Sequence, residues 1–202
     1  MRDDGTVTEV ADRPEPALGD ATRTGFRGVN HLALVTPDMD ATVRFWAGVL
    51  GCPLVATVGT PQFRHYFFEI GEGSTVAFFE YATAPVAAFA KPAGVPDARA
   101  IQFDHLSLDL PDEEALVALA ARLRAAECEV TELVDHGFIR SIYFTDPSGI
   151  ALEASYWVND ATAPARADFA DPRLFADEDP VPAVAELAEG GRLTSTPRTA
   201  LS

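Results

Sequence analysis

The chain has 202 residues, 48% of them hydrophobic and 23% charged, which is typical of a soluble globular protein and argues against a disordered one. An excess of 31 acidic over 15 basic residues gives a formal net charge of -16, which argues against nucleic acid or an anionic membrane as a partner, because phosphates are bound by clustered Lys and Arg. Two cysteines outside any CxxC pair exclude a disulfide scaffold, and the lack of a signal-peptide pattern or of an apolar run of about 20 residues predicts a cytoplasmic protein.

The first half of the chain predicts a strand, a helix and three further strands. Residues 1–25 are polar and acidic without a hydrophobic period, and we expect a flexible arm there. The elements are expected as strand 26–36, helix 37–50 and strands 53–59, 64–71 and 74–81. Thr36 or Asp38 is the predicted cap of the helix, and Gly51 ends it.

The second half repeats this order of elements. They are expected as strand 102–109, helix 112–126 and strands 129–133, 138–145 and 149–156. The predicted domain boundaries are 26–83 for module one, 84–100 for a Pro- and Ala-rich linker, 101–157 for module two and 158–202 for an extended tail with a short helix around 184–187. Because one four-stranded sheet with one helix leaves a face uncovered, two tandem βαβββ modules predict a packed α+β fold of mixed sheet.

The segments "HLALVTPDMDATV" and "HLSLDLPDEEALV" are near copies, and each opens on a histidine. If the modules are related by symmetry, His31 and His105 occupy equivalent positions. Glu153 lies among apolar residues of the last strand, where a carboxylate is costly to bury unless it is paired or bound to a metal. Two imidazoles and one carboxylate form a triad that suits Fe(II), and the same ligands suit Zn, Ni, Co or Mn. The alternative is a set of ordinary strand residues.

The two modules, the two strand histidines and the ending "DPSGIALE" resemble the vicinal oxygen chelate superfamily, which includes glyoxalase I, extradiol dioxygenases, methylmalonyl-CoA epimerase and the fosfomycin and bleomycin resistance proteins. The resemblance covers about residues 27–157. It implies a cup between paired modules that holds a divalent metal through His31, His105 and Glu153 and chelates substrates through two adjacent oxygens.

Members with four ligands take a further Glu or Gln from the last strand of module one, where this chain has Glu80. Counting from the turn glycine, the position that matches Glu153 falls at Ala77 or its neighbour Phe78, and Phe78 is the predicted equivalent. We therefore expect three ligands. In the alternative, Glu80 is a fourth ligand or a carboxylate that supports the site.

The stretch "VDHGFIRSIYFTDPSGIALE" is similar to the signature of extradiol ring-cleaving dioxygenases. This resemblance implies that His136 and Tyr143 face the substrate; the alternative is a loop histidine, a packed tyrosine and a plain hairpin turn. His65 is the candidate acid-base residue, with a surface or core role as the alternative. The predicted substrate-pocket residues are Arg64, Phe78, Phe138 and Arg140.

The favoured hypothesis is an Fe(II)-dependent extradiol-type dioxygenase that binds a catechol-like substrate and O2. The second is a glyoxalase-like lyase or an isomerase/epimerase, in which a redox-inert metal stabilises an enediolate and Glu80 or Glu153 moves the proton. The third is a metal-free protein that sequesters a small aromatic compound, for which two histidines and a glutamate are unnecessary. The expected partners are a small aromatic substrate, O2 for a dioxygenase, and a second copy in a homodimer.

Overall fold

The computed structural model describes residues 29–84, 86–99, 103–162, 168–179 and 181–190. These residues belong to two units, one within residues 26–165 and one that contains the described residues after 165. The arm predicted at 1–25 lies outside the described residues. In the second unit, the helix predicted around 184–187 is present as α3 (Pro182–Gly190). None of the helices in the described ranges is long and apolar enough to cross a membrane.

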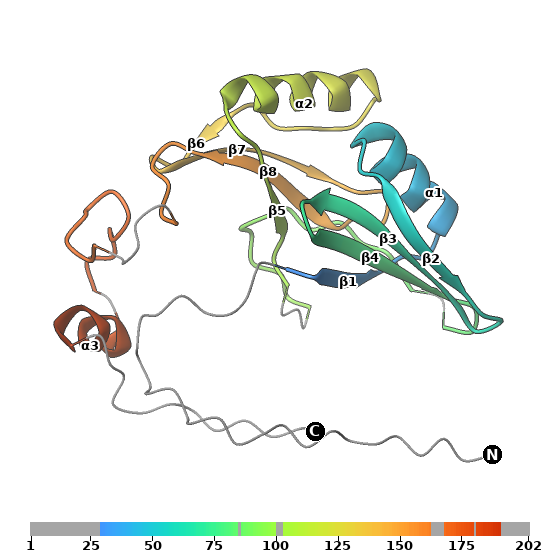
Figure 1. The fold of residues 1–202 in the computed structure, drawn as a ribbon, viewed down its shortest axis with the longest axis horizontal. Helices are drawn as coiled ribbons and strands as arrows, with labels where there is room; N and C mark the ends of the chain where they lie inside the picture. Colours follow the sequence, from blue (N-terminus) through green and yellow to red (C-terminus); the bar gives the residue numbers. More distant parts are fainter. Residues whose placement is uncertain (1–28, 85, 100–102, 163–167, 180, 191–202) are drawn as a thin grey trace, which may run out of the picture. The chain divides into compact units, whose positions relative to one another are not determined.

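Module one forms a sheet backed by a helix (Figure 1). Its elements are β1 (His31–Val35), α1 (Met39–Val43), η1 (Arg44–Val49), β2 (Leu54–Gly59), β3 (Phe63–Gly71) and β4 (Ser74–Tyr81). The strand order is β1-β4-β3-β2, with β1 parallel to β4 and the other pairs antiparallel. Asp38 is the helix cap, since its side chain accepts a hydrogen bond from the Ala41 amide at 3.0 Å. The helix continues with π-type bonding, in which the Leu50 amide donates to the Phe45 carbonyl at 3.0 Å.

Module two repeats this topology. Its elements are β5 (Leu106–Asp109), α2 (Glu113–Ala125), β6 (Val134–Asp135), β7 (Ile139–Thr145) and β8 (Ala151–Trp157), in the strand order β5-β8-β7-β6. The strand predicted at 129–133 is wrong, because only Val130 forms an isolated bridge, to Phe144, and the paired segment begins at Val134. Near this bridge the Thr131 hydroxyl accepts a hydrogen bond from the Tyr143 amide at 3.0 Å. A side-chain oxygen thus replaces the backbone carbonyl that would accept this bond in a regular pair of strands.

The two modules share one hydrophobic core, which confirms the predicted α+β fold of tandem βαβββ modules. Trp46 is fully buried in it, and its indole nitrogen lies 3.5 Å from a carboxylate oxygen of Asp146 in module two. The hydroxyls of Thr36 and Ser148, also one from each module, are 2.9 Å apart. The buried apolar residues of this core are Met39, Phe45, Trp46, Phe68, Val76, Phe78, Leu116, Ala120, Leu123, Ile142, Phe144, Leu152, Ala154 and Tyr156.

Strand alternation divides the side chains of each sheet between two faces. In β4, Val76 and Phe78 point into the core, and in β8, Leu152 and Ala154 do the same. The residues between them, such as Ala77 and Glu153, point to the opposite side of each sheet. We call this side the site face.

Candidate metal and substrate site

Glu153 is the centre of a polar group on the site face of module two. The strand register places it beside Ser107 of β5 and Tyr143 of β7, and residues paired in register project to the same face. Glu153 is only 6% exposed, and three side chains contact its carboxylate. It accepts hydrogen bonds from the Ser141 hydroxyl and, at 3.2 Å, from the Tyr143 hydroxyl, and it lies 2.9 Å from Nε2 of His105. These contacts compensate for the burial of the carboxylate.

His105 stands directly before β5, with carboxylates at both ring nitrogens. Its Nδ1 is 2.6 Å from an oxygen of Asp104, and its Nε2 faces Glu153. Hydrogen bonds from His105, Lys91 and Gly94 hold the pKa of Asp104 well below its usual range, so Asp104 is an ionised acceptor. Nδ1 therefore carries the proton of this hydrogen bond, and Nε2 is the nitrogen that is turned towards Glu153.

His136 and Tyr143 extend this group to the edge of the site. Nε2 of the exposed His136 is 2.8 Å from the Tyr143 hydroxyl, which in turn donates to Glu153. Burial, with a further effect of the Glu153 charge, raises the pKa of Tyr143, so its hydroxyl stays protonated at neutral pH. The structure thus brings together four of the residues selected from the sequence: His105, His136, Tyr143 and Glu153.

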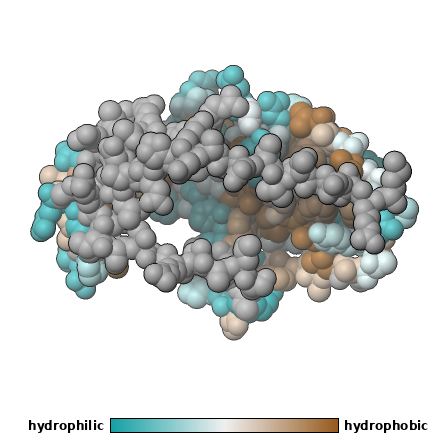
Figure 2. Space-filling model, turned by 60° about the horizontal axis from the view of Figure 1, so that its bottom comes forward, coloured by the Kyte–Doolittle hydropathy of each residue, from teal (hydrophilic) through white to brown (hydrophobic). Residues whose placement is uncertain are grey.

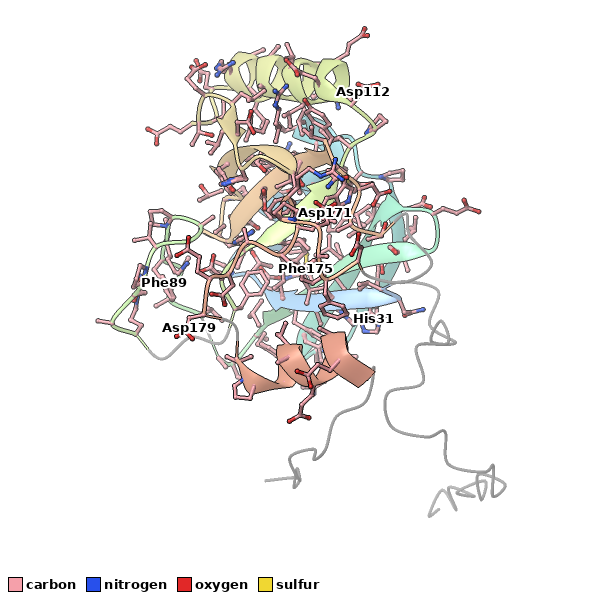
Figure 3. All side chains as sticks on the ribbon, turned by 90° about the vertical axis from the view of Figure 1, so that its left-hand side faces the viewer. His31, Phe89, Asp112, Asp171, Phe175 and Asp179 are labelled. Carbon is pink, nitrogen blue, oxygen red and sulfur yellow. The ribbon has the colours of Figure 1, made fainter. Side chains whose placement is uncertain are left out.

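His31 and His65 lie together on the site face of module one. His31 projects from β1 (Figure 3), and its Nδ1 donates a hydrogen bond to the side-chain oxygen of Asn30 at 2.8 Å. Its ring centroid is 6.5 Å from that of His65. The His65 ring stacks on Phe79 at 3.6 Å between centroids, and its buried Nε2 has no hydrogen-bond partner in the described part of the chain. Burial and the neighbouring His31 lower the pKa of His65. Within the described ranges no three His, Cys, Asp or Glu side chains come close enough to hold a metal, so His31 does not join His105 and Glu153 there.

The strand registers correct the predicted equivalence of Phe78 and Glu153. His31 pairs with Thr75 and Ala33 with Ala77, and in module two the residue two positions after His105, Ser107, pairs with Glu153. Ala77 therefore occupies the position that matches Glu153. Phe78 points the other way and is fully buried, with its ring 5.4 Å from Trp46, so it is a core residue and does not line a substrate pocket.

Glu80 and Arg64 also lie on the helix side of their sheet. Glu80 accepts a hydrogen bond from the Met39 amide at 3.1 Å and pairs with Arg64. This position separates Glu80 from His31, which projects from the opposite face, because strand alternation places Glu80 on the side of Phe78. The geometry therefore does not bring Glu80 to His31 as a fourth ligand, whereas Arg64 and Glu80 both line a cavity at this end of the sheet.

Arg140 is likewise on the helix side of module two. It bonds to Glu113 at 2.7 Å, to Asp135 at 3.2 Å and to the Tyr156 hydroxyl at 3.2 Å, so it ties β7 and β8 to the start of α2. Its predicted role as a substrate anchor is not supported by this arrangement. Phe138, directly before β7, packs its ring on Trp157 at 6.0 Å between centroids.

Two contributors to the site were missed in the sequence. Ser141 lies two residues before Tyr143 on the same strand, so alternation alone places both on one face, and this signal was available. Asp104 directly precedes a candidate ligand, yet its partners Lys91 and Gly94 come from the linker, and no sequence pattern places that linker beside β5.

Comparison with known proteins identifies the family. The model of the Glyoxalase/Bleomycin resistance protein/Dioxygenase superfamily matches residues 28–154, and the chain belongs to this superfamily. No curated protein matches the chain.

Solved structures share its fold at low sequence identity. A glyoxylase/bleomycin resistance protein/dioxygenase domain from Frankia sp. EAN1pec is 23% identical with a TM-score of 0.57, and the match covers 65% of this chain and 98% of that one. A glyoxalase family protein from Enterococcus faecalis is 21% identical with a TM-score of 0.51, over 64% and 98% of the two chains. TnmS3, an antibiotic binding protein from Streptomyces sp. CB03234, is 15% identical with a TM-score of 0.51, over 67% and 99%.

The superfamily commonly binds divalent metals. Two side chains on the site face of module two are suitable ligands for such an ion. An imidazole nitrogen and a carboxylate oxygen, 2.9 Å apart, face each other on the site face of module two. Both are donor types that first-row divalent metals accept. The outer nitrogen of the imidazole is already bonded to a carboxylate, as is usual for a histidine that ligates a metal.

Proposed function

We propose that the chain is a metal-dependent enzyme that acts on a small substrate chelated through two adjacent oxygens, and that it is an extradiol-type dioxygenase using Fe(II). His105 and Glu153 are the proposed ligands from module two, and His31 is the proposed third. The observation that carries this proposal is the buried carboxylate of Glu153, which faces Nε2 of His105 and accepts a hydrogen bond from the Tyr143 hydroxyl. A binding fold without a metal has no need of this costly arrangement.

The side chains around the proposed metal suit a catechol-like substrate. A bound Fe(II) would act as a Lewis acid that lowers the pKa of a substrate hydroxyl and would provide a place for O2. Tyr143 remains a neutral phenol, and because His136 bonds to the Tyr143 hydroxyl, the two form a proton path from Glu153 to the exposed edge of the site. Tyr143 and His136 are therefore the proposed catalytic residues for holding or moving a proton near the substrate oxygens.

His65 is the proposed acid-base residue of module one. Its lowered pKa favours the neutral imidazole, which can accept a proton, and its Nε2 has no partner among the described residues. The stacked Phe79 and the adjacent Phe67, whose centroid is 4.2 Å from that of His65, give this face an apolar character that suits an aromatic substrate.

We propose a homodimer, in which module one of one copy faces module two of the other. The proposal is supported by the absence, among the described residues, of any three His, Cys, Asp or Glu side chains that could hold a metal together. Module one also carries exposed apolar side chains on and beside its sheet, including Val58 at 47% and Tyr81 at 40% exposure. On the face shown in Figure 2, hydrophobic residues gather right of the centre, with hydrophilic residues around them.

Mixing two inactive variants tests the dimer. His31→Ala and Glu153→Gln homodimers each lack one ligand at every site. If His31 acts on the partner copy, a mixed dimer contains one intact site in two. Because random pairing of equal amounts makes about half of the dimers mixed, refolding the variants together restores metal binding to about a quarter of the wild-type level. If no metal is bound by the mixture, the ligands do not come from two copies.

The activity is tested by purifying the protein without oxygen, measuring its bound metal, and then following O2 uptake with a panel of catechols after Fe(II) loading. Stoichiometric iron with catechol-dependent O2 consumption supports the dioxygenase. Nickel or zinc with activity on a hemithioacetal supports the lyase or isomerase hypothesis instead. Absence of metal binding together with tight binding of an aromatic compound supports the sequestering protein.

A further inference from the structure

The linker between the modules is bound to module two beside the proposed metal ligand. Its Phe89 carbonyl oxygen lies 2.4 Å from where a Cβ on Gly149 would stand, so the linker backbone packs directly on the turn before β8. Figure 3 shows Phe89 on this linker. Five residues further, the Gly94 amide donates to Oδ1 of Asp104 at 2.7 Å. The linker thus reaches the residue that precedes His105.

The carboxylate of Asp104 accepts hydrogen bonds both from the linker and from His105. Oδ1 receives Nδ1–H of His105 at 2.6 Å together with the Gly94 amide, and Oδ2 receives the ammonium of Lys91 at 2.8 Å. Lys91 is only 6% exposed and also donates to the Pro92 carbonyl at 3.0 Å. A buried ammonium needs its counter-charge, so Lys91 holds the Asp104 carboxylate in one orientation.

This orientation decides which nitrogen of His105 can ligate. Asp104 and His105 are neighbours in the chain, and the carboxylate occupies Nδ1, so Nε2 is the nitrogen that remains for an ion shared with Glu153. Without an acceptor at Nδ1, the ring can rotate about its side-chain bonds and can take either tautomer. A metal would then have to order the ring before it binds, which lowers affinity.

We propose that Asp104 is the positioning residue of the metal site: it fixes the ring and tautomer of His105, and the linker fixes Asp104 through Lys91 and Gly94. The inference rests on the proposed metal site. It assigns the linker the task of holding a ligand, beyond that of joining two modules. Partners of this kind typically change metal affinity 10- to 100-fold when they are removed.

The sharpest test compares two double variants, Lys91→Met/Asp104→Asn and Lys91→Met/Asp104→Ala. Both variants lack the Lys91 ammonium, so neither leaves a buried positive charge unpaired. They differ in the hydrogen-bond acceptor for His105, since the asparagine carbonyl can still accept from Nδ1–H and alanine cannot. Zn(II) affinity is measured by competition with a chromophoric chelator. We expect the alanine variant to bind Zn(II) about 10- to 100-fold more weakly than the asparagine variant. Equal affinity in the two would overturn the proposal.

Two controls separate this outcome from failure of the metal site or of folding. Asp97→Asn removes a linker carboxylate that bonds to Arg99, and it should leave Zn(II) affinity unchanged. His105→Ala should abolish binding; if it does not, the proposed metal site itself is wrong. A readout on the unaltered chain is the ¹⁵N spectrum of Zn(II)-loaded protein, in which His105 should show a protonated, exchange-protected Nδ1. An unprotonated Nδ1 would overturn the proposal without any variant.

Discussion

Gly149 offers a quantitative test of how the linker packs on module two, because module one contains a matched control. Gly73 and Gly149 precede the last strand of their modules and have φ angles of +73° and +81°. An alanine at either position pays for the left-handed conformation, about 1–2 kcal/mol. A Cβ at Gly73 meets no atom within 4 Å, whereas one at Gly149 would lie 2.4 Å from the Phe89 carbonyl oxygen and 2.8 Å from the Ala90 nitrogen.

The linker must therefore move away for Gly149→Ala to fold. Real Cβ atoms essentially never come closer than 3.0 Å to such neighbours, and backbone shifts of this kind cost about 1–3 kcal/mol. We expect Gly73→Ala to lose about 1–2 kcal/mol of unfolding free energy and Gly149→Ala to lose about 1–3 kcal/mol more. Urea unfolding followed by circular dichroism measures both. Equal losses in the two variants would show that the linker does not rest on this turn.

Three further results are expected. Trp46→Ala should lower the free energy of unfolding by about 3–5 kcal/mol because the indole is fully buried in the shared core, whereas Val117→Ala, at a side chain that is 58% exposed, should change it by less than about 0.5 kcal/mol; similar losses would contradict the core assignment. Burial raises the pKa of Cys52 to about 11, so the folded state favours the thiol at neutral pH and loses that preference as pH rises through 11; iodoacetamide at pH 8 should modify Cys52 roughly 100-fold more slowly in folded than in urea-unfolded protein, and equal rates by peptide mass spectrometry would refute the burial. Tyr143→Phe removes a proton donor to Glu153 and should lower the rate of catechol-dependent O2 uptake about 100-fold with unchanged iron content, whereas loss of iron would assign the hydroxyl a role in metal binding instead.

Hydrophobic periodicity, turn chemistry and the internal repeat predicted most of the fold. The helix that begins after Asp112 and the hairpin of β3 and β4 appear where their patterns place them, because apolar spacing and capping are local properties of the sequence. The strand expected at 129–133 is not formed, because the Thr131 side chain accepts the hydrogen bond of the Tyr143 amide. Hydrophobic periodicity contains no information on such a side-chain hydrogen bond.

The candidate site was predictable only where it depends on one strand or on the repeat. The resemblance of the stretch around Glu153 to the extradiol signature singled out Tyr143 and His136, and the structure places Tyr143 against Glu153 and His136 against Tyr143. Counting from a turn glycine left the equivalent position in module one ambiguous between Ala77 and Phe78, and only the pairing of β1 with β4 decides it. The charge of Arg140 suggested a substrate anchor, whereas the structure pairs it with Asp135 on the neighbouring strand β6 and with Glu113, which lies 27 residues away at the start of α2.

The metal content of His105→Ala tests the central claim most directly. His105 faces Glu153 through Nε2 and Asp104 through Nδ1, and it is not one of the core residues, so the variant removes the proposed ligand and should leave the core intact. Protein is loaded with Fe(II) without oxygen, freed of excess metal by gel filtration and analysed by mass spectrometry of the elements, with circular dichroism to verify the fold. A metal site at His105 and Glu153 predicts about one iron per chain in the wild type and a loss of at least about tenfold in the variant. Full iron occupancy in folded His105→Ala would contradict it.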